Sequence, residues 1–179
     1  MLAEQGKIDE IIASLEHITS DAEKARTLAR LAENNVKNKA GKIQLLERAL
    51  QYLSDGLDTS DPFAAYCNIV SVYAQVDAER GFALFEPQLD SINRFWEAAA
   101  LYCSFESNGI CPGRKGELVV LPQSGLVRSL YEFLNTFRAL GKADFFKASE
   151  LAQRIKNPEV RCHALISLIE SKLVLVEDK

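Results

Sequence analysis

The chain has 179 residues, of which 47% are hydrophobic and 26% charged, and its formal net charge is −4; this is the composition of a folded domain and not of a disordered chain. The sequence pI of about 5.3 argues against nucleic-acid binding, which usually depends on a basic face. No apolar run reaches the length of a membrane span and the N-terminus has no signal-peptide pattern, so we expect a cytoplasmic protein that does not bind a membrane.

The first part of the chain predicts two helical hairpins. Isoleucine and leucine recur at helical spacing from Lys7 to Ile18, and Ser20 with Glu23 three residues later carries the capping-box signal of a second helix. A third amphipathic stretch follows a polar break, and Asp61 followed by proline marks a fourth helix start. Because short connections make consecutive helices antiparallel, we expect helix pairs over about 7–36 and 40–76.

The middle of the chain predicts a third pair over about 78–106 and then an insertion. Asp77 is placed to cap a helix in which Pro87 removes an amide, so the helix should end or kink there, and Asp90 is placed to cap the next helix. The segment 107–124 has no helical periodicity and contains the β-branched run GELVVLP, which we interpret as a loop with a short strand. Insertions in repeat proteins often lie on the binding face.

The last part predicts a fourth pair within 126–174. Apolar residues at helical spacing resume at Leu126. Asn157, Pro158 and Glu159 combine a cap, a first-turn proline and a negative charge at the positive end of the helix dipole. A helix is therefore expected to begin at this point.

Three of the predicted helix starts share one pattern, with apolar side chains five, eight, eleven and twelve residues after the cap. These residues are Ala25, Leu28, Leu31 and Ala32 after Ser20, Tyr66, Ile69, Val72 and Tyr73 after Asp61, and Cys162, Leu165, Leu168 and Ile169 after Asn157. The distance from Ser20 to Asp61 is 41 residues, which matches repeat units that bury their apolar faces only against neighbouring units. The sequence therefore predicts a repeat protein.

The segment 158–170, PEVRCHALISLIE, resembles the HEAT-repeat pattern of a proline-bearing turn followed by Val-Arg and leucine positions. GFALFEPQLDSINRFWEAAALYCSFE, GELVVL, ADFFKASELAQRI and NPEVR, in this order, resemble uncharacterised bacterial helical-repeat proteins. The resemblance implies a fold and no activity. We expect one all-α domain over 1–179, an α-α superhelix (a HEAT-like or TPR-like solenoid) of about four to five antiparallel helix pairs.

No arrangement of residues predicts a catalytic, cofactor or metal site. His17 and His163 have no ligating partner three or four residues away, and phosphate loops, zinc spacings and the Ser-His-Asp order are missing. We expect no cofactor, and the missing motifs weigh against an enzyme. Cys67, Cys103 and Cys162 lie on or beside the predicted apolar stripes, so we expect them in the core.

Candidate partner-binding residues follow from the predicted helix faces and from the insertion. Basic residues expected to be exposed on the second helix of each pair are Arg26, Arg30, Arg94 and Lys172. Trp96 lies off the predicted stripe and next to Phe95, which makes it the candidate for a partly exposed aromatic contact, with packing between repeats as the alternative. Within the insertion, Cys111 has Arg114 and Lys115 close in sequence, which would favour a reactive thiolate.

Three functions remain open on the sequence. The first is a non-enzymatic helical-repeat scaffold that binds a protein or peptide along the second helices of the pairs. The second is a small-ligand-binding protein or an enzyme with a pocket between the helices and the 106–125 insertion. The third is a structural, self-assembling segment of a longer scaffold. A short solenoid exposes apolar end faces, which favours a homodimer through its ends.

Overall fold

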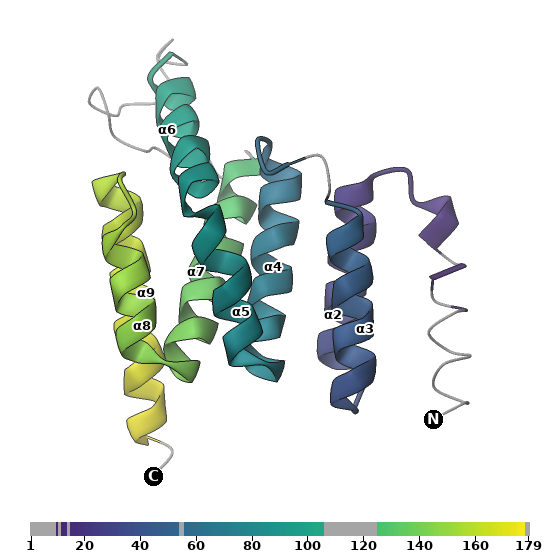
Figure 1. Cartoon of the computed structure of the whole chain (residues 1–179). Coiled ribbons are helices and arrows are strands. Elements are labelled where there is room, and N and C mark those ends of the chain that lie inside the picture. Colours follow the sequence, from purple (N-terminus) through teal and green to yellow (C-terminus); the bar gives the residue numbers. More distant parts are fainter. Residues whose placement is uncertain (1–9, 11, 14, 54–55, 106–124, 178–179) are drawn as a thin grey trace.

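The structure is a computed structural model and describes residues 10, 12–13, 15–53, 56–105 and 125–177, apart from the side chains of 102–105 and 174–177. In this part of the chain every regular element is helical, so the prediction of an all-α fold is confirmed (Figure 1). The elements are η1 (Leu15–His17), α2 (Asp21–Asn34), α3 (Lys39–Gln51), α4 (Ser60–Val76), α5 (Ala78–Phe85), η2 (Glu86–Gln88), α6 (Leu89–Phe105), α7 (Gly125–Ala143), α8 (Phe145–Gln153) and α9 (Pro158–Glu177). The strand predicted within 107–124 lies outside the described residues.

The helices lie in two rows (Figure 1). In the first row α2 packs against α4, α4 against α7, and α7 against α9. In the second row α3 contacts α2 and α4, α5 contacts α4 and α7, and α8 contacts α7 and α9. Each of these second-row helices therefore lies over the seam between two first-row helices, and α4 and α7 form the centre of the molecule.

Side-chain caps begin several of these helices, and three predicted caps are confirmed. The side chains of Ser20, Asp77 and Asn157 accept hydrogen bonds from first-turn amides of α2, α5 and α9 at 3.4, 3.2 and 3.1 Å. Each bond satisfies an amide that has no partner within its helix. The sequence therefore located the starts of these helices correctly.

Two predicted caps are wrong. α4 begins at Ser60 with Thr59 as its N-cap, so Asp61 lies in the first turn, where its charge still faces the positive end of the helix. Asp90 lies within the first turn of α6. At Pro87 the α-helix changes to a 3-10 turn without reversing the chain, because both junctions keep right-handed helical backbone. The kink predicted at Pro87 is confirmed.

The predicted helix pairs agree with the structure only in part. The pair over 78–106 is wrong, because α5, η2 and α6 follow one another in a single kinked rod (Figure 1). The range 40–76 contains α3 and α4, whereas 126–174 contains α7, α8 and most of α9. In the range 7–36, α2 is present, and Lys7 to Asp9 lie outside the described residues.

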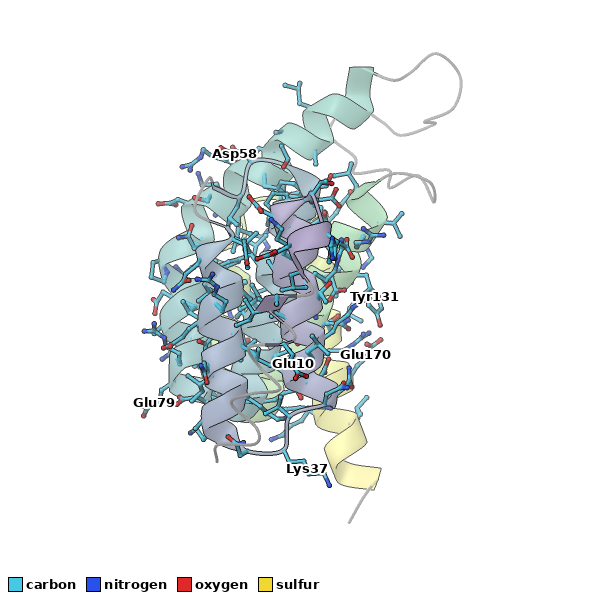
Figure 2. The ribbon with its side chains drawn as sticks, turned by 90° about the vertical axis from the view of Figure 1, so that its right-hand side faces the viewer. Glu10, Lys37, Asp58, Glu79, Tyr131 and Glu170 are labelled. Carbon is cyan, nitrogen blue, oxygen red and sulfur yellow. The ribbon has the colours of Figure 1, made fainter. Side chains whose placement is uncertain are left out.

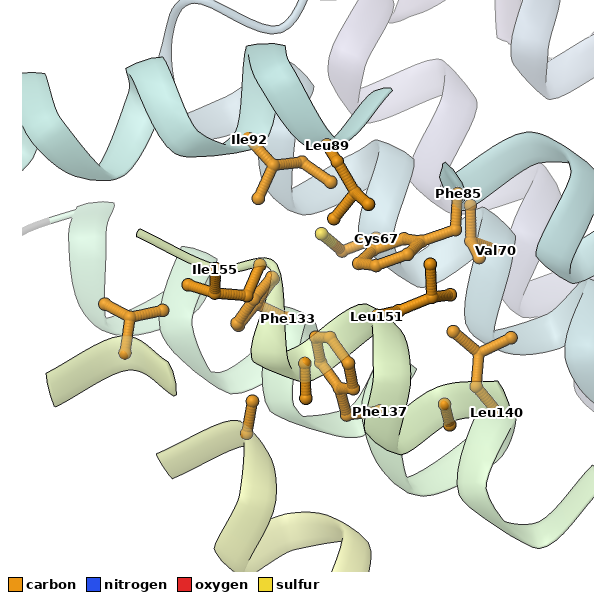
Figure 3. Packing of buried hydrophobic residues seen from close by; sticks show 14 of the residues in the cluster. Cys67, Val70, Phe85, Leu89, Ile92, Phe133, Phe137, Leu140, Leu151 and Ile155 are labelled. Atoms are coloured by element: carbon orange, nitrogen blue, oxygen red, sulfur yellow. The ribbon is translucent and has the colours of Figure 1, made fainter. Parts of the chain in front are cut away.

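Two hydrophobic clusters fill the space between the rows, and they differ in composition. The alanine-rich cluster, between α2, α3 and α4, includes Ala22, Ala25, Leu28, Ala29, Ala32, Leu45, Leu46 and Ala49. The aromatic cluster, between α4 and the helices that follow it, includes Phe63, Phe82, Phe85, Phe95, Trp96, Phe133 and Phe137. Figure 3 shows part of this cluster, with Phe85, Phe133 and Phe137 labelled. α4 contributes side chains to both clusters and is buried at every residue from Phe63 to Ala74.

The apolar stripe predicted on α9 is confirmed only in part, because Leu165 and Leu168 pack in the aromatic cluster and the other two residues do not. On α2 the same pattern is confirmed. Among its four residues only Leu168 is fully buried, whereas Cys162 and Ile169 are exposed. The side that packs consists of Val160, Ala164, Ser167, Leu168 and Ser171. Apolar residues lie on both sides of α9, so their spacing does not select the side that becomes buried.

Candidate functional site

A polar groove crosses α2, α4 and α7 in the first row. It has a volume of about 680 Å³ and is lined by Arg30, Glu33, Asn34, Asn68, Ser71, Gln75, Tyr131, Glu132, Asn135, Arg138, Ala139 and Lys142. In Figure 2 the lining residue Tyr131 lies on the same side of the molecule as Glu170 of α9, and Glu79 of α5 lies on the opposite side. The groove is therefore on the face of the molecule formed by the first row.

Helical spacing brings the lining side chains to one face. Asn68, Ser71 and Gln75 are three and four residues apart on α4, so they lie one above another. Glu132, Asn135 and Lys142 follow a similar spacing on α7. α4 and α7 bury their apolar residues in the clusters, which leaves the polar residues of these two helices at the groove.

Glu132 and Asn68 form the floor of the polar groove. Their exposed fractions are 7% and 9%, and the Asn68 side chain makes a hydrogen bond with Glu132. Because a carboxylate only accepts, the Asn68 amide nitrogen is the donor. The other polar atom, Asn68 Oδ1, is buried and has no hydrogen-bond partner in the described part of the chain. Such an acceptor costs about 1–3 kcal/mol, so the contact between α4 and α7 buries a polar side chain at the floor of the groove.

Burial disfavours the negative charge of Glu132 on the groove floor, and two arginines favour it. Burial raises the pKa of Glu132 above its ordinary value of 4.5, while the positive charges of Arg30 and Arg26 lower it in part. Arg26 was expected to be exposed, but its exposed fraction is only 4% and it forms an ion pair with Glu23. The expected exposure of Arg26 is wrong because this side of α2 faces α4, and a long side chain can bury its stem there.

The walls of the polar groove carry side-chain amides and cations. Asn34, Gln75 and Asn135 each offer a hydrogen-bond donor and an acceptor. Arg138 is held in place by two contacts, to Asn135 Oδ1 at 3.1 Å and to Glu170 of α9 at 2.6 Å. Among the described residues no carboxylate lies within 4.0 Å of the side-chain nitrogens of Arg30 or Lys142. These two cations are therefore placed to meet a ligand.

Of the predicted partner-binding residues, the structure places only Arg30 in the lining of the polar groove. Arg94 is exposed on α6, where it donates to Ser91 Oγ at 3.0 Å. Lys172 is exposed on α9, with its Nζ 5.9 Å from the centre of the Phe145 ring. The remaining predicted residues in the insertion, Cys111, Arg114 and Lys115, lie outside the described residues.

Of the two interpretations of Trp96, the partly exposed contact is wrong and packing between helices is confirmed, because its exposed fraction is 0%. Its ring centre lies 5.5 Å from those of Phe63 and Phe133 in edge-on contacts. The adjacent Phe95 is 7% exposed and stacks on Phe63 at 4.0 Å. Both consecutive residues are buried because the first half of α6 contacts Phe63 of α4 and Phe133 of α7. Trp96 is thus a core residue.

The described thiols do not supply a nucleophile to the polar groove. Cys67 is in the core as predicted, and burial raises its pKa, so it remains a neutral thiol. Cys162 is exposed on α9 and was predicted in the core, which is wrong for the reason given for the α9 stripe. The side chain of Cys103 lies outside the described residues. Nucleophilic catalysis at the polar groove therefore has no support from these thiols.

A second hollow lies beside Gly125, at the start of α7. It has a volume of about 460 Å³ and is lined by Asp58, Thr59, Ser60, Phe95, Ala98, Ala99, Gly125 and Leu126. Ala98 and Ala99 precede the segment 107–124, and Gly125 follows it. This hollow is the place where the second sequence hypothesis locates a ligand pocket.

Asn68, Ser71 and Glu132 were not among the residues predicted from the sequence. On α4 the missed signal is the presence of Asn68 and Ser71 within a helix that is otherwise almost entirely apolar. On α7 the missed signal is Glu132, which lies directly before Phe133 and one turn before Thr136. The Thr136 hydroxyl donates to the Cys67 carbonyl at 2.8 Å. Polar residues inside apolar helices mark either a helix contact or a binding face, and here they mark both.

Comparison of the chain with protein-family models, with curated proteins and with solved structures finds no match. In the described ranges no group of three or more His, Cys, Asp or Glu residues could hold a metal ion. No helix in those ranges combines the length and hydropathy of a membrane span. The function is therefore argued from the geometry of the polar groove.

Proposed function

We propose that this protein is a non-enzymatic helical-repeat scaffold that binds an extended segment of a partner protein or peptide in the polar groove. The observation that carries the proposal is a polar groove across three helices whose walls present side-chain amides together with the exposed cations Arg30 and Lys142. An extended peptide offers main-chain N–H groups and carbonyls in alternation, and the wall amides can meet both. Tyr131, which is 60% exposed, adds an aromatic surface for a partner side chain.

The arrangement in two rows supports a solenoid of the HEAT-like or TPR-like kind. In such a solenoid α2 with α3, α4 with α5, and α7 with α8 would be successive units, and α9 would begin another. The first helices of these units would line the binding face. A groove that crosses three units would bind a partner along several residues, which gives specificity without a deep pocket.

Selection of a random twelve-residue peptide library on the immobilised chain tests this proposal. We expect that the selected peptides bind at least about tenfold more weakly to Asn68→Ala and to the double variant Arg30→Ala/Tyr131→Ala, because the variants remove groove contacts. Arg94→Ala is the matched control, since Arg94 is equally a surface arginine but lies on α6. Peptides that bind the groove variants as tightly as they bind the control variant would contradict the proposal.

A second candidate function is a small-ligand-binding protein or an enzyme that uses the hollow beside Gly125. The apolar part of its lining, which includes Phe95, Ala99 and Leu126, favours a ligand with an apolar body. A metabolite that raises the melting temperature of the wild-type chain but not that of Ala98→Trp, which fills the hollow, would favour this candidate. An unchanged melting temperature across a broad panel would count against it.

A further inference from the structure

α9 is apolar on two opposite sides. One side packs against α7 and α8. On the other side Ile166, Ile169 and Leu173 are 46%, 54% and 60% exposed, and Cys162 is exposed as well. These four residues, the exposed α9 stripe, are spaced by four, three and four residues, which is the a/d spacing of a helix that packs against another helix. A helix that is apolar all round is normally covered on both sides.

The exposed α9 stripe lies at an end of the first row. α9 follows α7 in that row, and terminal units of repeat arrays usually present a polar outer face. The other end of the row differs from the α9 end. There the residues that precede α2 pack on the alanine-rich cluster through Ile12, Leu15 and Ile18. The exposed surface of α9 therefore resembles a protein interface more than the polar outer face of a terminal repeat.

We propose that the exposed α9 stripe binds the same stripe of a second copy of this chain, with the two α9 helices antiparallel. A two-fold axis between Ser167 and Leu168 sets Ile166 against the partner's Ile169 and Cys162 against the partner's Leu173. Each layer then combines side chains that fill a similar volume. A parallel pair would instead set cysteine against cysteine and leucine against leucine, which fills the layers unevenly.

The polar residues beside the stripe fit the antiparallel pair. His163 and Glu170 flank the stripe on one side, seven residues apart, so each Glu170 meets the partner's His163. On the other side Lys172 meets the partner's Leu165, and its aliphatic stem can cover that half-buried leucine. No two like charges face each other directly. The stripe is thus complementary to itself in its polar contacts as well as in shape.

Sedimentation equilibrium of the full chain tests the proposal. A small interface binds weakly, so we expect the mass to rise from monomer to dimer between about 1 and about 300 µM. Ile169→Glu places a charge in the centre of the stripe and is expected to weaken association at least about tenfold. Tyr131→Glu makes the same change at a similarly exposed residue on α7 and should leave association unchanged. Circular dichroism checks that both variants fold.

Two results would overturn the proposal: a wild-type chain that is monomeric at every concentration, and a dimer that Ile169→Glu leaves intact. A monomer overturns it even where the stripe is found to bind a different protein. The outcome is also separable from that of the proposed function, because peptide binding is measured with variants of the polar groove and association with a variant of the exposed α9 stripe, and the groove and the stripe share no residue.

The native thiol of Cys162 tests the antiparallel direction. Eleven residues separate Cys162 from the partner's Cys162 along the axis, about 16 Å at 1.5 Å per residue, which is too far for a disulfide. Leu173→Cys brings a thiol opposite Cys162. In a Cys103→Ser/Cys111→Ser background, oxidised glutathione should cross-link Leu173→Cys into dimers and should leave the background chain uncross-linked. A dimer cross-linked through Cys162 alone would overturn the antiparallel pair.

Discussion

The alanine-rich cluster and the aromatic cluster stabilise the same two-row arrangement by different means. In the first, Ala25, Ala29 and Ala32 have no exposed surface, and their small side chains let α2 approach its neighbours closely. In the second, the rings of Phe63 and Phe133 fill a wider space, with their centres 6.2 Å apart. One cluster therefore depends on small volume and the other on large volume, so each is sensitive to the opposite change in side-chain size.

The largest expected effect is the loss of a ring from the aromatic cluster. Phe133 is fully buried and lies against Phe85, Trp96 and Phe137 with ring centres 6.3, 5.5 and 5.1 Å away. We expect Phe133→Ala to lower the free energy of unfolding by about 3–5 kcal/mol, measured by urea denaturation. The nearby Tyr131→Ala should change it by no more than about 0.5 kcal/mol. Equal effects would mean that the aromatic cluster is not packed as described.

The next effect is the addition of volume to the alanine-rich cluster. Ala29→Leu adds three carbons at a fully buried site and is expected to destabilise the chain by about 1–3 kcal/mol, because the neighbouring helices must move apart. Ala40→Leu in the exposed first turn of α3 is the control and should be close to neutral. A neutral or stabilising Ala29→Leu would show that space remains between α2 and α4.

A smaller, pH-dependent effect is expected at Glu132, which lies outside both clusters on the floor of the polar groove. Its pKa is raised in the folded chain, so the folded state binds the proton more tightly than the unfolded state does. The stability that this proton contributes is complete below about pH 4.5, the unfolded value, and is lost as the pH rises through the folded pKa. We therefore expect Glu132→Gln to become more stable relative to wild type as the pH rises through this window, by chemical denaturation. A difference independent of pH would contradict the raised pKa.

The smallest effect is expected at the ion pair that joins α7 to α9 outside the aromatic cluster. Arg138 and Glu170 are 2.6 Å apart, with side chains 40% and 50% exposed. A double-mutant cycle with alanine should give a coupling energy of about 0.2–1 kcal/mol, since exposed pairs are screened by solvent. The longer Arg128–Asp61 pair, at 3.5 Å, should give less. A large coupling energy would mean that charge, and not ring packing, dominates this contact.

The sequence predicted those parts of the fold that depend on neighbouring residues. The caps at Ser20, Asp77 and Asn157 and the kink at Pro87 are local, because the donor and the acceptor lie within one turn of each other. The side of α9 that becomes buried and the environment of Trp96 depend on helices distant in the sequence. Spacing alone could not decide between two apolar sides of α9, nor foresee that α4 and α7 would cover the base of α6.

The polar groove shows the same limit. Arg30 was identified because a basic residue on a helix face is visible in the sequence, whereas Asn68 and Glu132 acquire their meaning only when α4 lies beside α7. The unpaired acceptor at Asn68 Oδ1 is a property of that contact and not of any single helix. Binding sites formed by long-range packing of this kind are predictable from the sequence only as polar interruptions of apolar helices.

The position of α4 has a consequence for the way the chain unfolds. Phe63 and Cys67 of α4 belong to the aromatic cluster, and Ile69 and Tyr73 belong to the alanine-rich cluster. Neither cluster can lose α4 while the other remains intact, so the two should melt in one cooperative transition. The amides of α4 should then exchange with solvent more slowly than those of the outer helices, and their exchange should report the global free energy of unfolding.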